Sequence, residues 1–225
     1  MAETTQKALL IRLERYDNNA HLATFLNENG QFTLYAQGLD KPTSKNRANL
    51  QLMSVINLEF FKARLNKKIG KLKKASIEIP VSFSDSQSAK FLKKIQKIAL
   101  SINNKNSFFD LYCSLISKMS QGKNTEIFLI MLANLIENQG IMPQLYFCGV
   151  CKSHNQITDF DFVKKTFLCF LHGKERLDET FLELIYSVFH DYENFYRKSN
   201  TRYNQFIYEI LSDILKEAGL EFSYK

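Results

Sequence analysis

Residues 148–172 read CGVCKSHNQITDFDFVKKTFLCFLH, and the interpretation of the chain starts from this stretch. It holds a Cys-x-x-Cys pair and, seventeen residues later, a Cys-x-x-His pair, formed by Cys148, Cys151, Cys169 and His172. Two such pairs at this separation are typical of a structural zinc site, because each tight turn supplies two ligands and no position stays open for chemistry. Gly149 lets the backbone curl so that both sulfurs of the first pair face one ion.

Free cysteine is also a common small core residue, so buried thiols without a metal are the alternative interpretation of these positions. The motif favours zinc because three of the four cysteines of the chain lie within it. The fourth, Cys113, lies in a helical pattern and is predicted to be a core residue. We therefore expect one structural Zn²⁺ ion per chain.

The composition indicates a globular protein without a membrane span. The 225 residues are 45% apolar, and the longest wholly apolar run, Ile127–Ala133, is far shorter than the ~20 residues that cross a bilayer. Residues 1–7 contain no apolar signal region. We expect a cytoplasmic location, where thiols stay reduced and a metal site is favoured over disulfides.

The positive charge lies mostly near the N-terminus. The net charge is +7, and residues 1–80 carry 13 basic and 7 acidic residues, against 17 and 16 in residues 81–225. This asymmetry indicates that the N-terminal part binds a polyanion, since a surplus kept for solubility would be spread along the chain.

The first 80 residues have the pattern of a small β-barrel. Alternating or β-rich runs predict strands at 6–16, 21–26, 31–37, 50–65 and 71–79, with a hairpin turn at 27–30. Five strands without a helix of any length fit an OB-fold, which commonly binds single-stranded nucleic acid.

Two segments of this barrel carry the residues predicted to bind DNA. The loop at 38–47 has turn formers, hydroxyls and basic side chains that suit phosphate contact, and residues 62–74 hold seven basic residues with no acid among them. The predicted DNA-binding residues are Lys41, Ser44, Lys45, Arg47, Lys62, Arg64, Lys67, Lys68, Lys71, Lys73 and Lys74. Tyr35, Phe60 and Phe61 would stack bases if exposed, although alternation favours the core for such aromatics.

From Ser84 onward the period changes to that of helices. Helices are predicted from a capping box at 84–87 through residue 102, at 107–120, 126–138, 178–190 and 202–218, and a small hairpin turning at Lys164-Lys165 is predicted inside the metal motif. The predicted fold class is α+β: an N-terminal five-stranded OB-fold barrel over 1–80, then an α-helical domain over 81–225 that carries a zinc module at 148–172. The face of the first helix that holds Lys90, Lys93, Lys94 and Lys97 is either simply solvated or a binding surface.

The loop Gly38-Leu-Asp-Lys-Pro-Thr-Ser-Lys-Asn-Arg-Ala-Asn-Leu-Gln51 resembles the signature after the third strand in bacterial RecO, the recombination mediator. Phe128–Cys151 resembles that family's entry to a zinc site of four cysteines. The family-like positions of the loop are Gly38, Lys41, Ser44, Lys45, Arg47 and Gln51. The departures are Asp40 for a basic residue, Leu52 for proline, Lys164-Lys165 for a glycine pair, and His172 for the last cysteine; histidine is still a sound zinc ligand.

The resemblance implies a non-enzymatic protein that binds single- and double-stranded DNA and anneals complementary strands. It also implies partnership with RecR, with the C-terminal tail of single-strand-binding protein, and functionally with RecF and RecA, in the cytoplasm at the nucleoid. The sequence itself has no Walker pattern or partnered catalytic histidine. Two alternatives stay open: an accessory module of a DNA-processing enzyme such as a ligase, and a pure protein-interaction scaffold.

Overall fold

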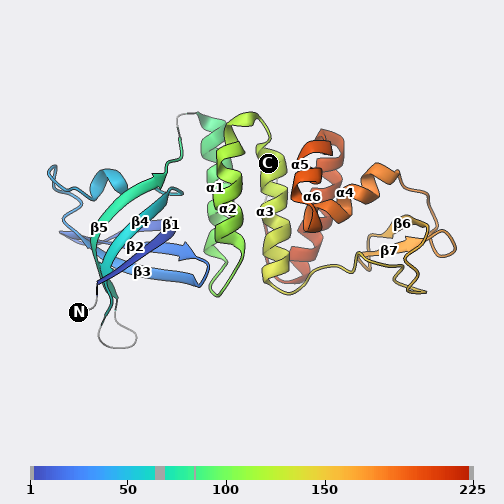
Figure 1. Cartoon of the computed structure of the whole chain (residues 1–225), viewed down its shortest axis with the longest axis horizontal. Coiled ribbons are helices and arrows are strands. Elements are labelled where there is room, and N and C mark those ends of the chain that lie inside the picture. Colours follow the sequence, from blue (N-terminus) through green and yellow to red (C-terminus); the bar gives the residue numbers. More distant parts are fainter. Residues whose placement is uncertain (1–2, 64–68, 84, 223–225) are drawn as a thin grey trace. The chain divides into compact units, whose positions relative to one another are not determined.

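The computed structural model describes residues 3–63, 69–83 and 85–222, and Figure 1 shows its helices and strands. The chain divides into two compact units, Met1–Ser117 and Lys118–Lys225. The first unit holds the barrel and the helices α1 (Ser86–Leu100) and α2 (Phe108–Leu115), and the second holds the later α-helices and the cysteine-rich segment. The predicted domain boundary at residue 80, with DNA binding assigned to residues 1–80, stays a prediction.

The barrel has five strands, β1 (Glu3–Asp17), β2 (Ala20–Asn27), β3 (Gly30–Gln37), β4 (Val55–Phe61) and β5 (Gly70–Ile79). They close in the order β1-β2-β3-β5-β4, with β4 paired back to β1. Among the described strands of the barrel, β3 and β5 alone pair in parallel, through Leu34↔Gly70 and Tyr35↔Lys71. The predicted five-stranded OB-like barrel, and with it the α+β class, is confirmed.

Alternating positions of the strands, interrupted by bulges, fill the barrel with apolar side chains. Ala8 and Leu10 of β1 face inward with Ile56 and Leu58 of β4, all of them fully buried. One end of the barrel is closed by the segment between β3 and β4, whose Leu39 and Leu50 join the same core. This segment contains the short helix η1 (Arg47–Asn49).

The helices α1 (Ser86–Leu100) and α2 (Phe108–Leu115) are bonded to the barrel within the first unit. Gln96 of α1 donates to the carbonyl of Ile11 at 2.6 Å, and Tyr112 of α2 donates to the carbonyl of Met53. The side chain of Asp85 caps α1 by accepting the N–H of Ser88 at 2.8 Å, so the cap lies one residue later than the predicted capping box.

The second unit is built on four α-helices, α3 (Asn124–Asn138), α4 (Glu179–His190), α5 (Tyr192–Lys198) and α6 (Thr201–Glu217), and the short helix η2 (Ile116–Gln121) runs across the division between the units. Residues 126–136 of α3 are all buried, as expected for the central helix of the unit. The short α5 was not predicted; Asp191 caps it directly after α4, and Phe195 anchors it in the core. The strands β6 (Ile157–Asp161) and β7 (Thr166–Cys169) form the predicted small hairpin.

Within the described residues, every helix is too short or too polar to cross a membrane.

Candidate metal centre and nucleic-acid surface

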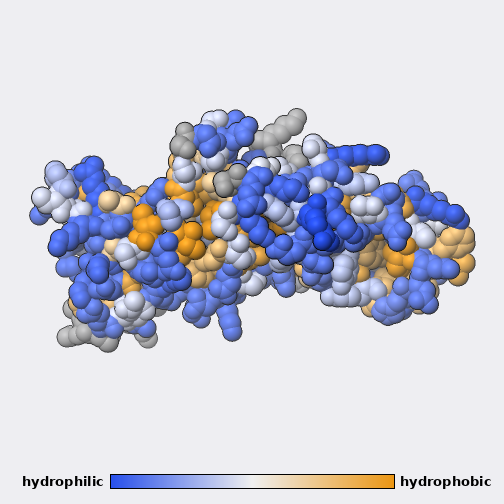
Figure 2. Space-filling view, turned by 45° about the horizontal axis from the view of Figure 1, so that its top comes forward, coloured by the Kyte–Doolittle hydropathy of each residue, from blue (hydrophilic) through white to orange (hydrophobic). Residues whose placement is uncertain are grey.

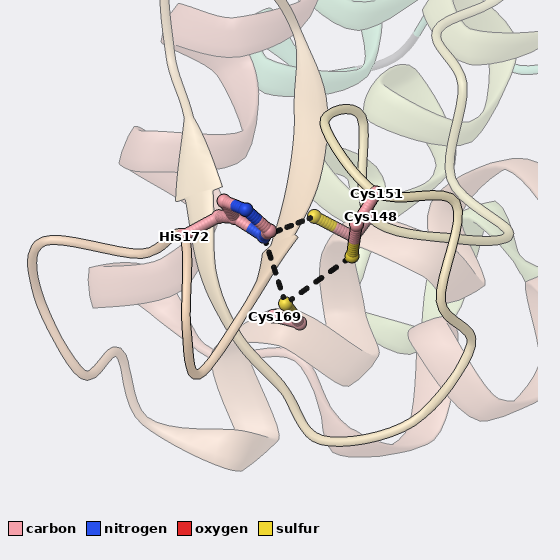
Figure 3. Close-up of side chains that lie close together, drawn as sticks. All are labelled: Cys148, Cys151, Cys169 and His172. Atoms are coloured by element: carbon pink, nitrogen blue, oxygen red, sulfur yellow. Dashed lines mark hydrogen bonds between the residues drawn. The ribbon is translucent and has the colours of Figure 1, made fainter.

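Two backbone turns bring the four predicted metal ligands together (Figure 3). In the first turn the N–H of Lys152 donates to the carbonyl of Cys148 at 2.9 Å. In the second, which follows β7 directly, the N–H groups of His172 and Gly173 both donate to the carbonyl of Cys169, at 2.9 and 2.8 Å. Each turn therefore aims two ligand side chains at the same point.

The distances between the ligand atoms fit one tetrahedral ion. All four atoms lie within 4.8 Å of one another. The sulfurs of Cys151 and Cys169 are 3.7 Å apart, and Nδ1 of His172 lies 3.3 Å from the sulfur of Cys169 and 3.7 Å from that of Cys148. Ideal zinc bonds at the tetrahedral angle give about 3.8 Å between two sulfurs and about 3.6 Å between sulfur and nitrogen. The cluster could hold one metal ion, and its donor set is that of zinc.

The backbone around Cys148 favours the thiolate that a metal requires. Burial by itself would raise the pKa of this thiol, but N–H groups of Cys151, Cys169 and Val150 turned toward the sulfur lower the pKa to about 6. Cys113 is the contrast, because burial raises the pKa of its thiol to about 11. The Cys148 sulfur thus favours the thiolate form, whereas the half-buried Cys113 thiol of the first unit favours the protonated form.

Close packing, not an unusual backbone angle, requires glycine after the first ligand. A Cβ on Gly149 would lie 2.5 Å from Cγ2 of Thr166 on β7, and one on Gly173 would lie 2.7 Å from Cβ of Asp159 on β6. Both turns therefore pack directly against the hairpin. Lys165 has φ of 53° in the hairpin turn, a conformation that glycine adopts at lower cost.

Apolar side chains reach the surface over this module (Figure 2). Val150 and Leu171, in the middle of the two turns, are 56% and 82% exposed, and Val163 of the hairpin turn is 84% exposed. The guanidinium of Arg176 lies over the ring of Phe170, 4.7 Å from its centroid.

In the barrel, Asn46 ties the first predicted DNA-binding segment to the second. Its side chain accepts the N–H of Ala75 at 2.9 Å and donates to the carbonyl of Lys73 at 3.3 Å, both on β5. The loop that carries Lys45 and Arg47, which are exposed, is thereby held beside the basic strand. The sequence analysis missed Asn46, since nothing in its local pattern indicates a partner on β5.

A β-bulge turns two consecutive lysines of β5 outward. The register between β4 and β5 shifts between Glu59↔Lys74 and Phe60↔Leu72, so Lys73 is the extra residue. Leu72 and Ala75 are buried on either side, while Lys73 and Lys74 are both exposed. Strict alternation would have turned one of the two inward.

Carboxylates from neighbouring strands offset part of this charge. Lys73 lies 2.6 Å from a carboxylate oxygen of Glu3 and 3.5 Å from one of Glu59, and Lys74 lies 3.3 Å from Glu59. These hydrogen bonds raise the pKa of Lys73, first through Glu3. Residues 62–74 contain no acidic residue, but the fold brings two carboxylates, Glu3 and Glu59, next to their lysines.

Lys62 and Lys71 are exposed, as are Lys41, Lys45 and Arg47 in the loop, and Ser44 is half-buried. Within the described parts of the chain, no carboxylate is paired with these five cations. Arg64, Lys67 and Lys68 lie outside the described residues. The described cations near β5 are therefore Lys62, Lys71, Lys73 and Lys74, with the loop held alongside them.

The predicted aromatic residues lie mostly away from solvent. Phe60 is a core residue, 4% exposed, and Phe61 is half-buried. Tyr35 is half-buried and donates to Asp17 at 3.0 Å. Tyr16, which the sequence analysis did not single out, is 64% exposed and makes an edge contact with Tyr35.

The lysine face of α1 is mostly solvated. Lys90, Lys93 and Lys97 are exposed, while burial, with the charge of Lys90 as a smaller cause, lowers the pKa of the half-buried Lys94. This helix belongs to the unit of the barrel.

Comparison with known proteins identifies matches in both units. Residues 1–80 match the family model described as recombination protein O N terminal, and residues 99–184 match that described as recombination protein O C terminal. No curated protein sequence matches the chain. Among solved structures there is a similarity to asparaginyl-tRNA synthetase of Entamoeba histolytica, with 7% identity and a TM-score of 0.31, over 63% of this chain and 33% of the synthetase. The chain thus spans a third of that enzyme, and the likeness is too weak to bear on function.

Proposed function

Because this chain belongs to the recombination protein O family and is therefore a DNA-binding mediator of recombination in DNA repair, we propose the following activity for it. It binds single- and double-stranded DNA, anneals complementary strands, and, together with RecR, helps to load RecA onto single strands coated by single-strand-binding protein. RecF is a further functional partner. The protein works in the cytoplasm, at the nucleoid, and it acts by binding and not as an enzyme.

One observation carries the proposal for DNA: the bond from Asn46 to β5, which holds the basic loop beside the basic strand. The two segments then present Lys45, Arg47, Lys62 and Lys71 from one rigid barrel. Cations fixed in this way neutralise phosphates and release counterions, which gives binding that depends on salt and little on base sequence. The same charge lowers the repulsion between two strands that are being annealed.

The metal centre has a structural role in this proposal. One zinc ion per chain, held by Cys148, Cys151, Cys169 and His172, fixes the two turns and the β6–β7 hairpin as one module. The donor distances and the donor set of three thiols and one imidazole support zinc as the ion. Four protein ligands leave no open position, so the ion supplies stability and no chemistry.

The proposed partner is the C-terminal tail of single-strand-binding protein, taken to be acidic and to end in an aromatic residue. This chain has two candidate sites for that tail. One is the lysine face of α1, at Lys90, Lys93, Lys94 and Lys97. The other is a hollow of about 370 Å³ in the second unit, lined by the apolar Ile141, Met142 and Ile214, by Lys164, and by the ion pair of Lys165 with Glu217. The hollow fits an aromatic end better, since the apolar side of α1 is buried.

An electrophoretic assay of binding and annealing, with and without single-strand-binding protein, tests the proposed function. Salt-dependent binding and faster annealing of coated strands are the expected results. Absence of DNA binding would favour a protein-interaction scaffold instead, and covalent labelling of the chain by ATP or NAD would favour an accessory module of a ligase. Charge reversal at Lys93 and Lys97, compared with Lys164→Glu, assigns the tail to one of its two candidate sites.

A further inference from the structure

The two ends of the barrel are built differently. Leu39 and Leu50 close one end, with Leu52 packed against them. At the other end, where β1 and β5 begin and β4 ends, there is a hollow of about 640 Å³. Its lining combines apolar side chains, among them Leu34 and Ile69, with polar ones such as Gln6 and Asn27. A cavity of this size is in the usual range for a small-molecule site.

A polar side chain occupies an inward-facing position at this open end. Ala8 and Leu10 face the barrel interior, and Gln6, which is half-buried, continues the same alternation along β1. Lys62 follows β4 directly and is exposed at the rim. Gln6 and Lys62 both line the hollow. Apolar residues are the usual choice at inward-facing positions, so the half-buried amide of Gln6 indicates a polar ligand.

The floor of the hollow contains an aromatic ring that a ligand can reach. Phe32 stacks on Phe25 and on Phe60, with ring centroids 5.5 and 5.8 Å apart. Phe25 and Phe60 are 0% and 4% exposed, whereas Phe32 is half-buried and lines the hollow together with Phe60. The stack holds Phe32 rigidly and leaves its free surface turned to the hollow.

We propose that this hollow accepts a nucleobase turned out of single-stranded DNA. The inference rests on the proposed DNA binding and adds a base-binding site to it. The ring of Phe32 stacks on the base, the amide of Gln6 offers one donor and one acceptor group to the base edge, and Lys62 at the rim pairs with a flanking phosphate.

The chemistry of the lining favours this occupant. An apolar ligand would leave Gln6 and Lys62 without partners, and within the described residues neither a hydrogen bond to the Gln6 amide nor an ion pair of Lys62 is present. A base in a duplex reaches the hollow only after it is unpaired and unstacked, which costs free energy. The site therefore gives the barrel a preference for single strands that phosphate contacts alone do not provide.

The test is a comparison of two oligonucleotides with the full-length protein. One is a thymidine oligomer, and the other has the same length and phosphates but abasic residues. Phe32→Leu keeps an apolar side chain in the floor and removes the ring. It should weaken binding of the thymidine oligomer about tenfold and leave binding of the abasic oligomer, of duplex DNA and the salt dependence unchanged. Gln6→Leu, in a second variant, should weaken the same binding without altering the floor.

Phe83→Leu is the matched control, because Phe83 is 38% exposed in the same unit and does not line the hollow. If Phe32→Leu and Gln6→Leu weakened binding of the thymidine and abasic oligomers equally, the base site would be overturned. The same would follow if neither variant weakened binding of the thymidine oligomer. In both cases the parent protein would still bind DNA. A parent protein that bound neither oligomer would contradict the proposed function instead. Competition by free thymidine monophosphate at low concentration would show that the hollow serves a nucleotide and not a base of a strand.

Discussion

The side-chain carbonyl of Asn46 accepts the backbone N–H of Ala75 at 2.9 Å, across 29 residues of sequence. The same amide donates to the carbonyl of Lys73, so it satisfies one backbone group of the bulged residue and one two residues beyond it. One polar side chain thus fixes both the bulge, which turns Lys73 and Lys74 outward, and the position of the loop before η1. The shape of the proposed DNA surface depends on this contact.

Replacing Asn46 by alanine should lower the free energy of unfolding by about 1–3 kcal/mol, because the N–H of the buried Ala75 loses its acceptor. Asn49→Ala is the control, since the Asn49 amide bonds only to Lys45 within the loop and its loss should cost less. Asn46→Asp keeps the acceptor and should recover part of the loss. Urea denaturation measures all three, and equal stability of Asn46→Ala and the parent would contradict this role.

Protein purified without chelator should contain about one zinc ion per chain, by the four-ligand rule. His172→Ala should lose zinc and melt at a lower temperature, while binding of DNA by the barrel stays largely intact. His154→Ala is the matched variant, because the imidazole of His154 bonds to the carbonyl of Tyr146 and lies outside the cluster. Elemental analysis and thermal melting give the answer, and a fully folded parent without metal would refute the site.

Gly149→Ala should destabilise the metal module, because the new Cβ would lie 2.5 Å from Cγ2 of Thr166 and 2.7 Å from its Oγ1. Thr166→Ala removes both atoms, so it should restore zinc binding in the double variant. The difference between the effect of the double variant and the sum of the two single effects measures the contact between residues 149 and 166. Additive losses of zinc affinity in the double variant would show that Gly149 is required for another reason.

Lys71→Gln should flatten the slope of log affinity against log salt by roughly 0.7 for single strands, the effect of one lost phosphate contact. Lys73→Gln should flatten it less, because Glu3 and Glu59 already offset the charge of Lys73. Lys105→Gln, at an exposed lysine between α1 and α2, is the control and should leave the slope unchanged. Salt titrations of binding that ranked Lys73 above Lys71 would contradict the role given to the ion pairs.

The sequence predicted what periodicity and spacing encode. Alternation placed the five strands, and the paired spacing placed the four ligands that the turns at Cys148 and Cys169 bring together. It did not predict features set by the packing of distant segments. Glu3 meets Lys73 only because β1 and β5 flank β4, and the bulge at Lys73 follows from the register of β4 with β5.

Local signals failed where tertiary contacts decide. The helix α5 has seven residues and gains its stability from the burial of Phe195, so no periodic pattern announces it. Alternation favoured the core for Phe60, and the barrel does bury it, whereas Phe32, which the sequence analysis did not single out, is half-buried and lines the open end. The segment that carries Leu39 and Leu50 closes one end of the barrel, so an aromatic residue at the other end, Phe32, remains accessible.

The central claim is that the cations of the barrel, on and beside β5, carry the DNA. Its most direct test is the affinity for single strands, measured against salt, of the variant with Lys67, Lys68, Lys71 and Lys73 replaced by glutamate. The control is the same change at four exposed lysines outside the barrel, Lys105, Lys152, Lys174 and Lys216. We predict weaker binding, a flatter salt dependence and slower annealing for the first variant, with zinc content unchanged, and little effect for the second. Parent-like binding and annealing by the first variant at moderate salt would contradict the claim and direct the search to the Lys90–Lys97 face of α1.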